Sequence, residues 1–170
     1  MGFRISWMGF DGKNKASALE MVGLKDTGEP DEINETPFSG AEIVGGWFIL
    51  FSNDFGFVSR ERLAQLSVDC QIVACQVHEG IMFSAAYGYD RGRRVWELAH
   101  NLQLGTYDLS VFGSPPASFE SIRQHLTQEQ EVSPRRADYI FNIPIEVAAA
   151  ICKYRHAEWS PASFTRLEVR

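Results

Sequence analysis

The alternation of apolar and polar residues is most regular between Cys70 and Phe112, where it predicts an antiparallel meander. Four consecutive segments there are rich in Val, Ile, Tyr, Phe and Trp, the side chains that suit a pleated, half-buried surface. Glycine-containing turns separate them, as is usual between antiparallel neighbours. The predicted strands are Cys70–Val77, Ile81–Tyr89, Arg93–Asn101 and Thr106–Phe112.

The turn at residues 90–92, Asp-Arg-Gly, sets the register of the two middle strands. We expect a three-residue loop with its glycine in the left-handed conformation. Ala86 would then lie opposite Trp96, a favourable pairing of a small with a large residue. In this register Glu97 points to an almost wholly apolar face and His100 to the other. A sheet of this kind needs helices on at least one side.

Capping residues and helical periodicity predict three to four helices around this sheet. A Ser or Asn before a helix accepts hydrogen bonds from its first free N–H groups, and apolar residues then recur every three or four positions. Such segments follow Asn14, Ser59 and Ser118, and Pro144 suits the first turn of a last helix. These helices are expected to end near Val22, Leu66, Leu126 and Tyr154.

Three further segments are predicted to form strands. Trp47–Phe51 is a continuous apolar run, typical of a strand buried on both faces. Phe3, Ile5 and Trp7 alternate with polar residues and indicate a short N-terminal strand before a glycine-rich turn. Asp138–Asn142 is interpreted as another short strand. With the meander at its centre, we predict a mostly antiparallel sheet of about five to seven strands.

Residues 25–42 are polar and acidic, lack periodicity and are predicted to form a long surface loop. Long loops inside compact domains tend to be functional or disordered. The carboxylates of this loop are candidate contacts for a basic partner or a cation, although a solvated acidic loop is the commoner arrangement. They belong to Asp26, Glu29, Asp31, Glu32 and Glu35. At the other end of the chain, residues 160–170 are predicted to form a loose tail.

Length and composition are those of one globular domain. The 170 residues suffice for one sizeable core, which predicts a single domain over residues 1–170. A hydrophobic content of 45% and a charged content of 22% are ordinary for such a domain. The net charge of −6 argues against nucleic-acid binding, which needs a basic stripe. It favours a basic protein partner, or simply keeps the protein in solution.

The sequence predicts a cytoplasmic protein with reduced thiols. No apolar run approaches the ~20 residues of a membrane span, and the first residues carry no apolar leader. Cys70 and Cys75 are expected on opposite faces of one strand, and Cys152 falls in a helix, so no disulfide is predicted. No histidine pair has the spacing of zinc ligands, and no cofactor fingerprint occurs.

Three residues are candidates for catalysis. Glu97 is the strongest, because a carboxylate on an apolar face can act as a general acid or base where a cleft reaches it. The alternative is a structural salt bridge to an arginine. His100 ends the same strand, and Asp54 lies in a polar triplet after the buried strand at Trp47–Phe51. A small hydrolase or transferase would use Glu97 or His100, but the sequence has no nucleophile elbow.

Aromatic residues near loops suggest a recognition surface for another protein. The chain holds four Trp, five Tyr and 12 Phe, and exposed aromatic side chains commonly anchor protein interfaces. The alternative is that these rings plug the edges of the sheet. The candidates for partner binding are Trp7, Phe10, Phe55 and Phe57.

Two segments in the second half of the chain resemble a family of small uncharacterised bacterial α+β proteins. These are residues 89–101 (YDRGRRVWELAHN) and residues 138–146 (DYIFNIPIE). A small, acidic, single-domain α+β chain is also similar in type to bacterial toxin-immunity proteins. This likeness implies an inhibitor that acts by binding another protein.

We therefore expect an α+β domain that works as a non-enzymatic, cytoplasmic protein-binding module, with an immunity-type inhibitor as the specific form. An enzyme built on Glu97 or His100 is the first alternative. A homo-oligomer that pairs through an exposed strand edge is the second, and the sequence leaves the oligomeric state open.

Overall fold

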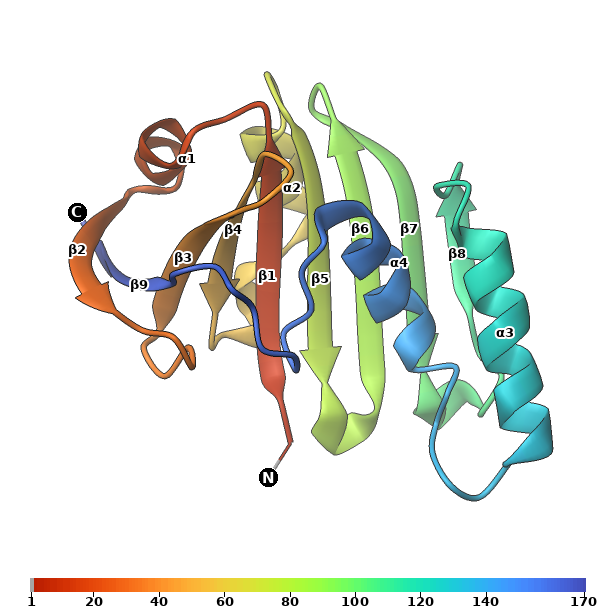
Figure 1. Cartoon of the computed structure of the whole chain (residues 1–170). Helices are drawn as coiled ribbons and strands as arrows, with labels where there is room; N and C mark the ends of the chain where they lie inside the picture. The colour runs from red at the N-terminus through yellow and green to blue at the C-terminus, as the bar shows by residue number, and fades with distance from the viewer. Residues whose placement is uncertain (1) are drawn as a thin grey trace.

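The strands form one open antiparallel sheet with the N-terminal strand in the middle (Figure 1). The computed structural model describes residues 2–170, and these form nine strands in the order β2-β9-β3-β4-β1-β5-β6-β7-β8. Their bounds are β1 Arg4–Asp11, β2 Leu24–Pro30, β3 Phe38–Ile43, β4 Trp47–Ser52, β5 Gln71–His78, β6 Phe83–Asp90, β7 Arg93–Asn101, β8 Ser110–Gly113 and β9 Thr165–Val169. The α+β architecture is confirmed, with more strands than predicted, and the meander β5–β8 forms one half of the sheet instead of its centre.

Four helices cover the two faces of the sheet (Figure 1). They are α1 Lys15–Val22, α2 Arg60–Leu66, α3 Phe119–Val132 and α4 Asn142–Cys152. Helix α4 packs across β5, β6 and β7 on one face, with α3 at its side. Helices α1 and α2 contribute Leu19 and Leu63 to the core on the opposite face. The predicted caps Asn14 and Ser59 are confirmed, since each side chain accepts a hydrogen bond from the first turn of its helix.

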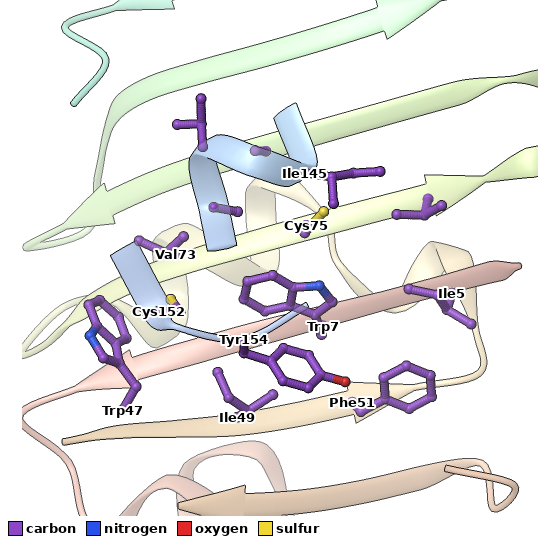
Figure 2. Close-up of a cluster of buried hydrophobic side chains, with 14 of the residues drawn as sticks. Ile5, Trp7, Trp47, Ile49, Phe51, Val73, Cys75, Ile145, Cys152 and Tyr154 are labelled. Atoms are coloured by element: carbon purple, nitrogen blue, oxygen red, sulfur yellow. The ribbon is translucent and has the colours of Figure 1, made fainter. Parts of the chain in front are cut away.

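Each face of the sheet carries its own hydrophobic core. Neighbouring residues of β1 divide between them, with Trp7 on the α4 face and Met8 on the other. Figure 2 shows Trp7 beside Tyr154, whose ring it meets edge to face with 5.2 Å between centroids. Because both faces are covered, β1 and β4 are buried almost throughout.

The hairpin between β6 and β7 has a two-residue loop, and the predicted three-residue loop is wrong. Arg91 and Gly92 both have positive φ angles, 51° and 74°, which matches the backbone twist that joins adjacent antiparallel strands. Asp90 therefore pairs with Arg93. One extra residue in β7, Val95, then forms a bulge that shifts the register again.

Trp96 consequently lies opposite Gly88, not opposite Ala86 as predicted. Glycine is required there, because a Cβ at Gly88 would lie 2.0 Å from the indole nitrogen of Trp96. The observed pairing differs from the predicted one by two residues, an even number. The side chains of both strands therefore still point to the faces of the sheet that were predicted. Glu97 still points to the face of β6 that carries Tyr87.

Residues 25–42 do not form a long loop, and residues 160–170 are not a loose tail. Most of the first segment is strand β2 and the start of β3, and β9 lies between these two strands. Phe164 and Leu167 are buried and hold β9 in place. The predicted strand at Asp138–Asn142 is also wrong: the Asp138 carboxylate accepts a hydrogen bond from Phe141 N–H in the turn that leads into α4.

Candidate functional site

Glu97 is a structural ion-pair residue that joins β7 to α2. Its side chain is 9% exposed and lies between two arginines. Arg60, the first residue of α2, donates from Nη2 to Oε1 (2.9 Å) and from Nε to Oε2 (3.1 Å). Arg94 donates to Oε2 from the other side, which the bulge at Val95 allows. The salt-bridge alternative is therefore the one observed, and the carboxylate is not free to act as a general base.

The three catalytic candidates are not brought together. Glu97 and His100 lie on opposite faces of β7. His100 is completely buried, and its ring nitrogens contact the Asp108 carbonyl oxygen (2.6 Å) and the Asp138 carboxylate (2.8 Å). Asp54 is exposed and accepts a hydrogen bond from Gly56 N–H in a turn at another part of the sheet. Each residue thus stabilises local structure.

Most of the predicted acidic contacts are engaged within the protein. Burial opposes ionisation of Asp26, but hydrogen bonds from Lys15 and Gly28 prevail and lower the pKa of Asp26. Asp31 is buried and accepts hydrogen bonds from its own turn, and Glu29 pairs with Arg166. The remaining two candidates, Glu32 and Glu35, are exposed. The five carboxylates therefore do not form one acidic surface.

The predicted recognition aromatics are not free surface residues. The expectation of exposed rings is wrong for Trp7 and Phe10, which are fully buried because β1 is the middle strand of the sheet. Phe55 is half-buried and packs edge to face on Phe83. Phe57 is half-buried beneath the Arg62 guanidinium. These rings complete the two cores and the α2 side of the sheet.

Several exposed apolar side chains lie on or just before β8. This strand is the outermost one of the meander (Figure 1). Val111 and Phe112 of β8 are 49% and 46% exposed, and Leu104 and Tyr107 in the preceding loop are 75% and 54% exposed. The pattern of residues along the sequence did not predict this surface. Its only signal was the apolar pair at the end of the last meander strand, and that pair would have been buried if another strand followed.

The backbone of β8 has an unpaired side. The strand pairs with β7 alone, with Phe112 opposite Glu97 and Val111 opposite Leu98. In the same register, Ser114 N–H donates to the Val95 carbonyl at 3.1 Å. Ladder bonds alternate along an antiparallel pair, so Phe112 directs its N–H and C=O to β7 and Val111 directs both outward.

Two hollows flank this strand, one on each face of the sheet. On the α2 face a hollow of about 400 Å³ is lined by Arg60, Arg94, Phe83 and Phe112. There the Arg94 guanidinium stacks on the Phe112 ring, 3.5 Å from its centroid. On the opposite face a groove of about 390 Å³ runs between β8 and α3. Its lining residues include Tyr107, Leu109, Val111, Phe119 and Arg123.

Residues 2–170 contain no cluster of three or more His, Cys, Asp or Glu residues that could hold a metal ion. In the same part of the chain, no helix has the length and apolar character needed to cross a membrane. The three cysteines are free and buried, and burial raises the pKa of the Cys152 thiol well above its usual range. They are therefore core residues and not reactive surface thiols.

Comparisons of the chain with family models, with curated proteins and with solved structures found no match. What the molecule can bind follows from its own surface. One part of that surface combines a free strand edge with two hollows: the β8 edge, defined here as Ser110–Gly113 with the two hollows beside it.

Proposed function

We propose that this protein is a non-enzymatic binding module that accepts an extended segment of a partner protein as an additional strand beside β8. The observation that carries this proposal is the outward-facing backbone of Val111 between two hollows. Extended peptides commonly bind in this way, with main-chain hydrogen bonds supplying affinity and side-chain pockets supplying specificity.

The length of β8 limits how much the backbone can contribute. The strand has four residues, and Gly113 turns the chain away with a φ of 72° before Pro115 and Pro116. Only a few ladder bonds can therefore form with a partner. The side chains of the bound segment must supply the rest of the affinity.

The two hollows are placed to receive those side chains. Alternate residues of an added strand point to opposite faces of the sheet. One set would lie beside Phe112 on the α2 face, and the other beside Val111 and Tyr107 on the α3 face. These walls are partly exposed and apolar, so burying them against a partner would be favourable.

The three catalytic candidates are all held in structural contacts, which supports a binding protein rather than an enzyme. Glu97 is held by two arginines, His100 is buried, and Asp54 caps a turn. An inhibitor of the toxin-immunity type would work as a binding module of this kind, in the cytoplasm, by occupying a surface of its target. The acidic residues that favoured a basic partner are mostly paired internally, so we place the contact at β8 instead.

Displayed random peptides, panned against the purified protein, test this proposal. Val111→Pro removes the outward N–H and leaves the ladder bonds of Phe112 to β7 in place. Val111→Thr keeps that N–H and serves as the matched control. We expect selected peptides to bind the wild type and Val111→Thr alike, and to bind Val111→Pro at least about tenfold more weakly.

Three results would overturn the proposal. Random peptides that give no enrichment would remove the peptide-binding function. Selected peptides that bind Val111→Pro as tightly as the wild type would place their site elsewhere. A wild-type dimer in light scattering that becomes a monomer on Val111→Pro would show that a second copy occupies the edge.

A further inference from the structure

The hollow on the α2 face contains more positive than negative charge. Arg60 and Arg94 both bind Glu97, and across residues 2–170 neither has another carboxylate within salt-bridge distance. We infer that the segment bound at β8 carries an Asp or Glu residue whose carboxylate is received by these two arginines. This inference rests on the proposed function, because it names the side chain that the binding site selects.

Both guanidinium groups retain unused donors. A guanidinium offers five N–H groups. Arg94 uses only Nη1 on Glu97, and Arg60 uses Nε and Nη2. The side chains are 28% and 66% exposed, so a ligand in the hollow can reach them. An arginine with free N–H groups in a fixed plane is well suited to bind a carboxylate through two parallel hydrogen bonds.

The position of Arg94 brings its guanidinium to the edge of the sheet. Its guanidinium lies over the ring of Phe112, which belongs to the edge strand itself. A strand added beyond β8 would run about 4.8 Å away, and every second side chain would lie beside Phe112 on this face. A carboxylate at that position is within reach of Arg94. Stacking on the ring also holds the guanidinium in place before the ligand arrives.

Within residues 2–170, the groove between β8 and α3 has no unpaired charge that would favour a charged residue in the bound segment. Arg123 there is already paired with Glu120, and the other walls, Tyr107, Leu109 and Val111, are largely apolar. The two hollows together therefore favour a segment in which an acidic residue is flanked on both sides by apolar residues.

The two arginines also disfavour a second copy of this chain as the occupant of the β8 edge. A second β8 would bring Ser110, Val111, Phe112 and Gly113, none of which is acidic. It would leave the donors of Arg60 and Arg94 unpaired and bring two positively charged hollows closer together. An acidic segment of another protein satisfies the site, and a symmetric dimer does not.

A focused display library tests this inference. Its peptides alternate Thr and Val, end in lysine for solubility, and have a central residue randomised to all amino acids. We expect Glu and Asp at the centre to be enriched about tenfold over Gln and Asn. Arg94→Met should abolish this preference while peptides without a central acid still bind. Arg166→Met, in β9 in the other half of the sheet and outside both hollows, is the matched control and should leave the preference unchanged.

Phe112→Leu supplies a second variant that keeps every charge. It removes the ring under the guanidinium, so the preference for Glu over Gln should fall although both arginines remain. Equal capture of Glu and Gln peptides by the wild type would overturn the inference and leave the proposed function intact. Capture of no peptide at all would overturn the proposed function. If Arg94→Met still preferred Glu over Gln as strongly as the wild type, the carboxylate of the peptide would be bound by another cation, and the inference would be contradicted.

Discussion

At one edge of the sheet β2 carries polar side chains that satisfy its own backbone, whereas at the other edge β8 presents apolar side chains to solvent. In β2 the Asp26 carboxylate accepts a hydrogen bond from Gly28 N–H, and the Thr27 hydroxyl accepts one from Glu29 N–H. A break in register and Pro30, which has no N–H, further interrupt this edge. In β8 no side chain of residues 2–170 bonds the outward N–H of Val111, and Val111 itself is half-exposed.

This contrast indicates that the two edges serve different purposes. Charged side chains, bulges and prolines are the usual protection of an edge strand against pairing with other chains. Strand β2 has all three features, with Lys25 and Glu29 among its exposed charges. Strand β8 is protected only by its shortness, and it has a hollow on each side. An open edge beside two hollows is the arrangement expected of a binding site.

The largest predicted effect concerns the glycines that support the two edges. Gly88→Val should lower the free energy of unfolding by about 3 kcal/mol, because its side chain would enter the space of Trp96 in the strand pair that carries β8. Gly28→Ala in β2, where φ is 75° and no atom lies within 4 Å of an added Cβ, should cost only about 1 kcal/mol. Urea unfolding measures both values. Equal losses would contradict the packing described at Trp96.

Acid should destabilise the fold through His156, whose ring packs edge to face on Phe3 next to β1. His156 lies in the connection from α4 to β9, and burial, with a smaller contribution from the positive charge of Arg155, lowers its pKa to about 4. An unfolded histidine titrates near 6.5. Between these values the unfolded chain binds a proton that the folded chain does not. The contribution of the neutral His156 ring to the free energy of unfolding is therefore complete above pH 6.5. Up to about 3 kcal/mol of it is lost as the pH falls to 4.

The variants His156→Gln and His125→Gln isolate this effect. His125 is exposed on α3, so His125→Gln is the matched control for replacing one histidine. His156→Gln should flatten the decline between pH 6.5 and 4 in urea unfolding. The same steepness in wild type and His156→Gln would assign the acid sensitivity to other groups.

The smallest predicted effects distinguish the edges directly. Val111→Lys should change stability by no more than about 0.5 kcal/mol, since the side chain is half-exposed, yet it should abolish peptide binding at β8. Thr27→Val removes the acceptor for Glu29 N–H and should cost about 1 kcal/mol without any effect on peptide binding. Thermal unfolding and peptide titration measure the two quantities. Loss of peptide binding in Thr27→Val would reverse the assignment of the edges.

The sequence predicts the strands and helices whose pattern is long and regular. The meander, the buried strand at Trp47–Phe51 and the helices capped by Asn14 and Ser59 are all confirmed. Strands β2, β3 and β9 were not predicted. A charged edge strand such as β2 resembles a loop in sequence, and β9 is stabilised by inserting between β2 and β3, which are distant from it in the chain. The predicted register of β6 and β7 was wrong because the bulge in β7 depends on how Trp96 packs over Gly88.

The candidate site was less predictable than the fold, for a physical reason. For Glu97 the sequence left catalysis and a salt bridge to an arginine as alternatives; Arg60 lies on another element, and no local pattern identifies it as the partner. The exposure of Val111 and Phe112 depends on which strand stands last in the sheet. Strand order is set by the packing of the whole chain, so an alternating apolar pattern alone does not reveal a free edge.

Backbone amide exchange followed by NMR, with and without an acid-bearing peptide from the focused library, tests the central claim most directly. We predict that exchange of the Val111 N–H slows at least about tenfold on binding, while the amides of Gly28 and Glu29 in β2 keep their rates. A peptide that binds with the Val111 amide unchanged, or that protects β2 instead, would contradict the assignment of β8 as the binding edge.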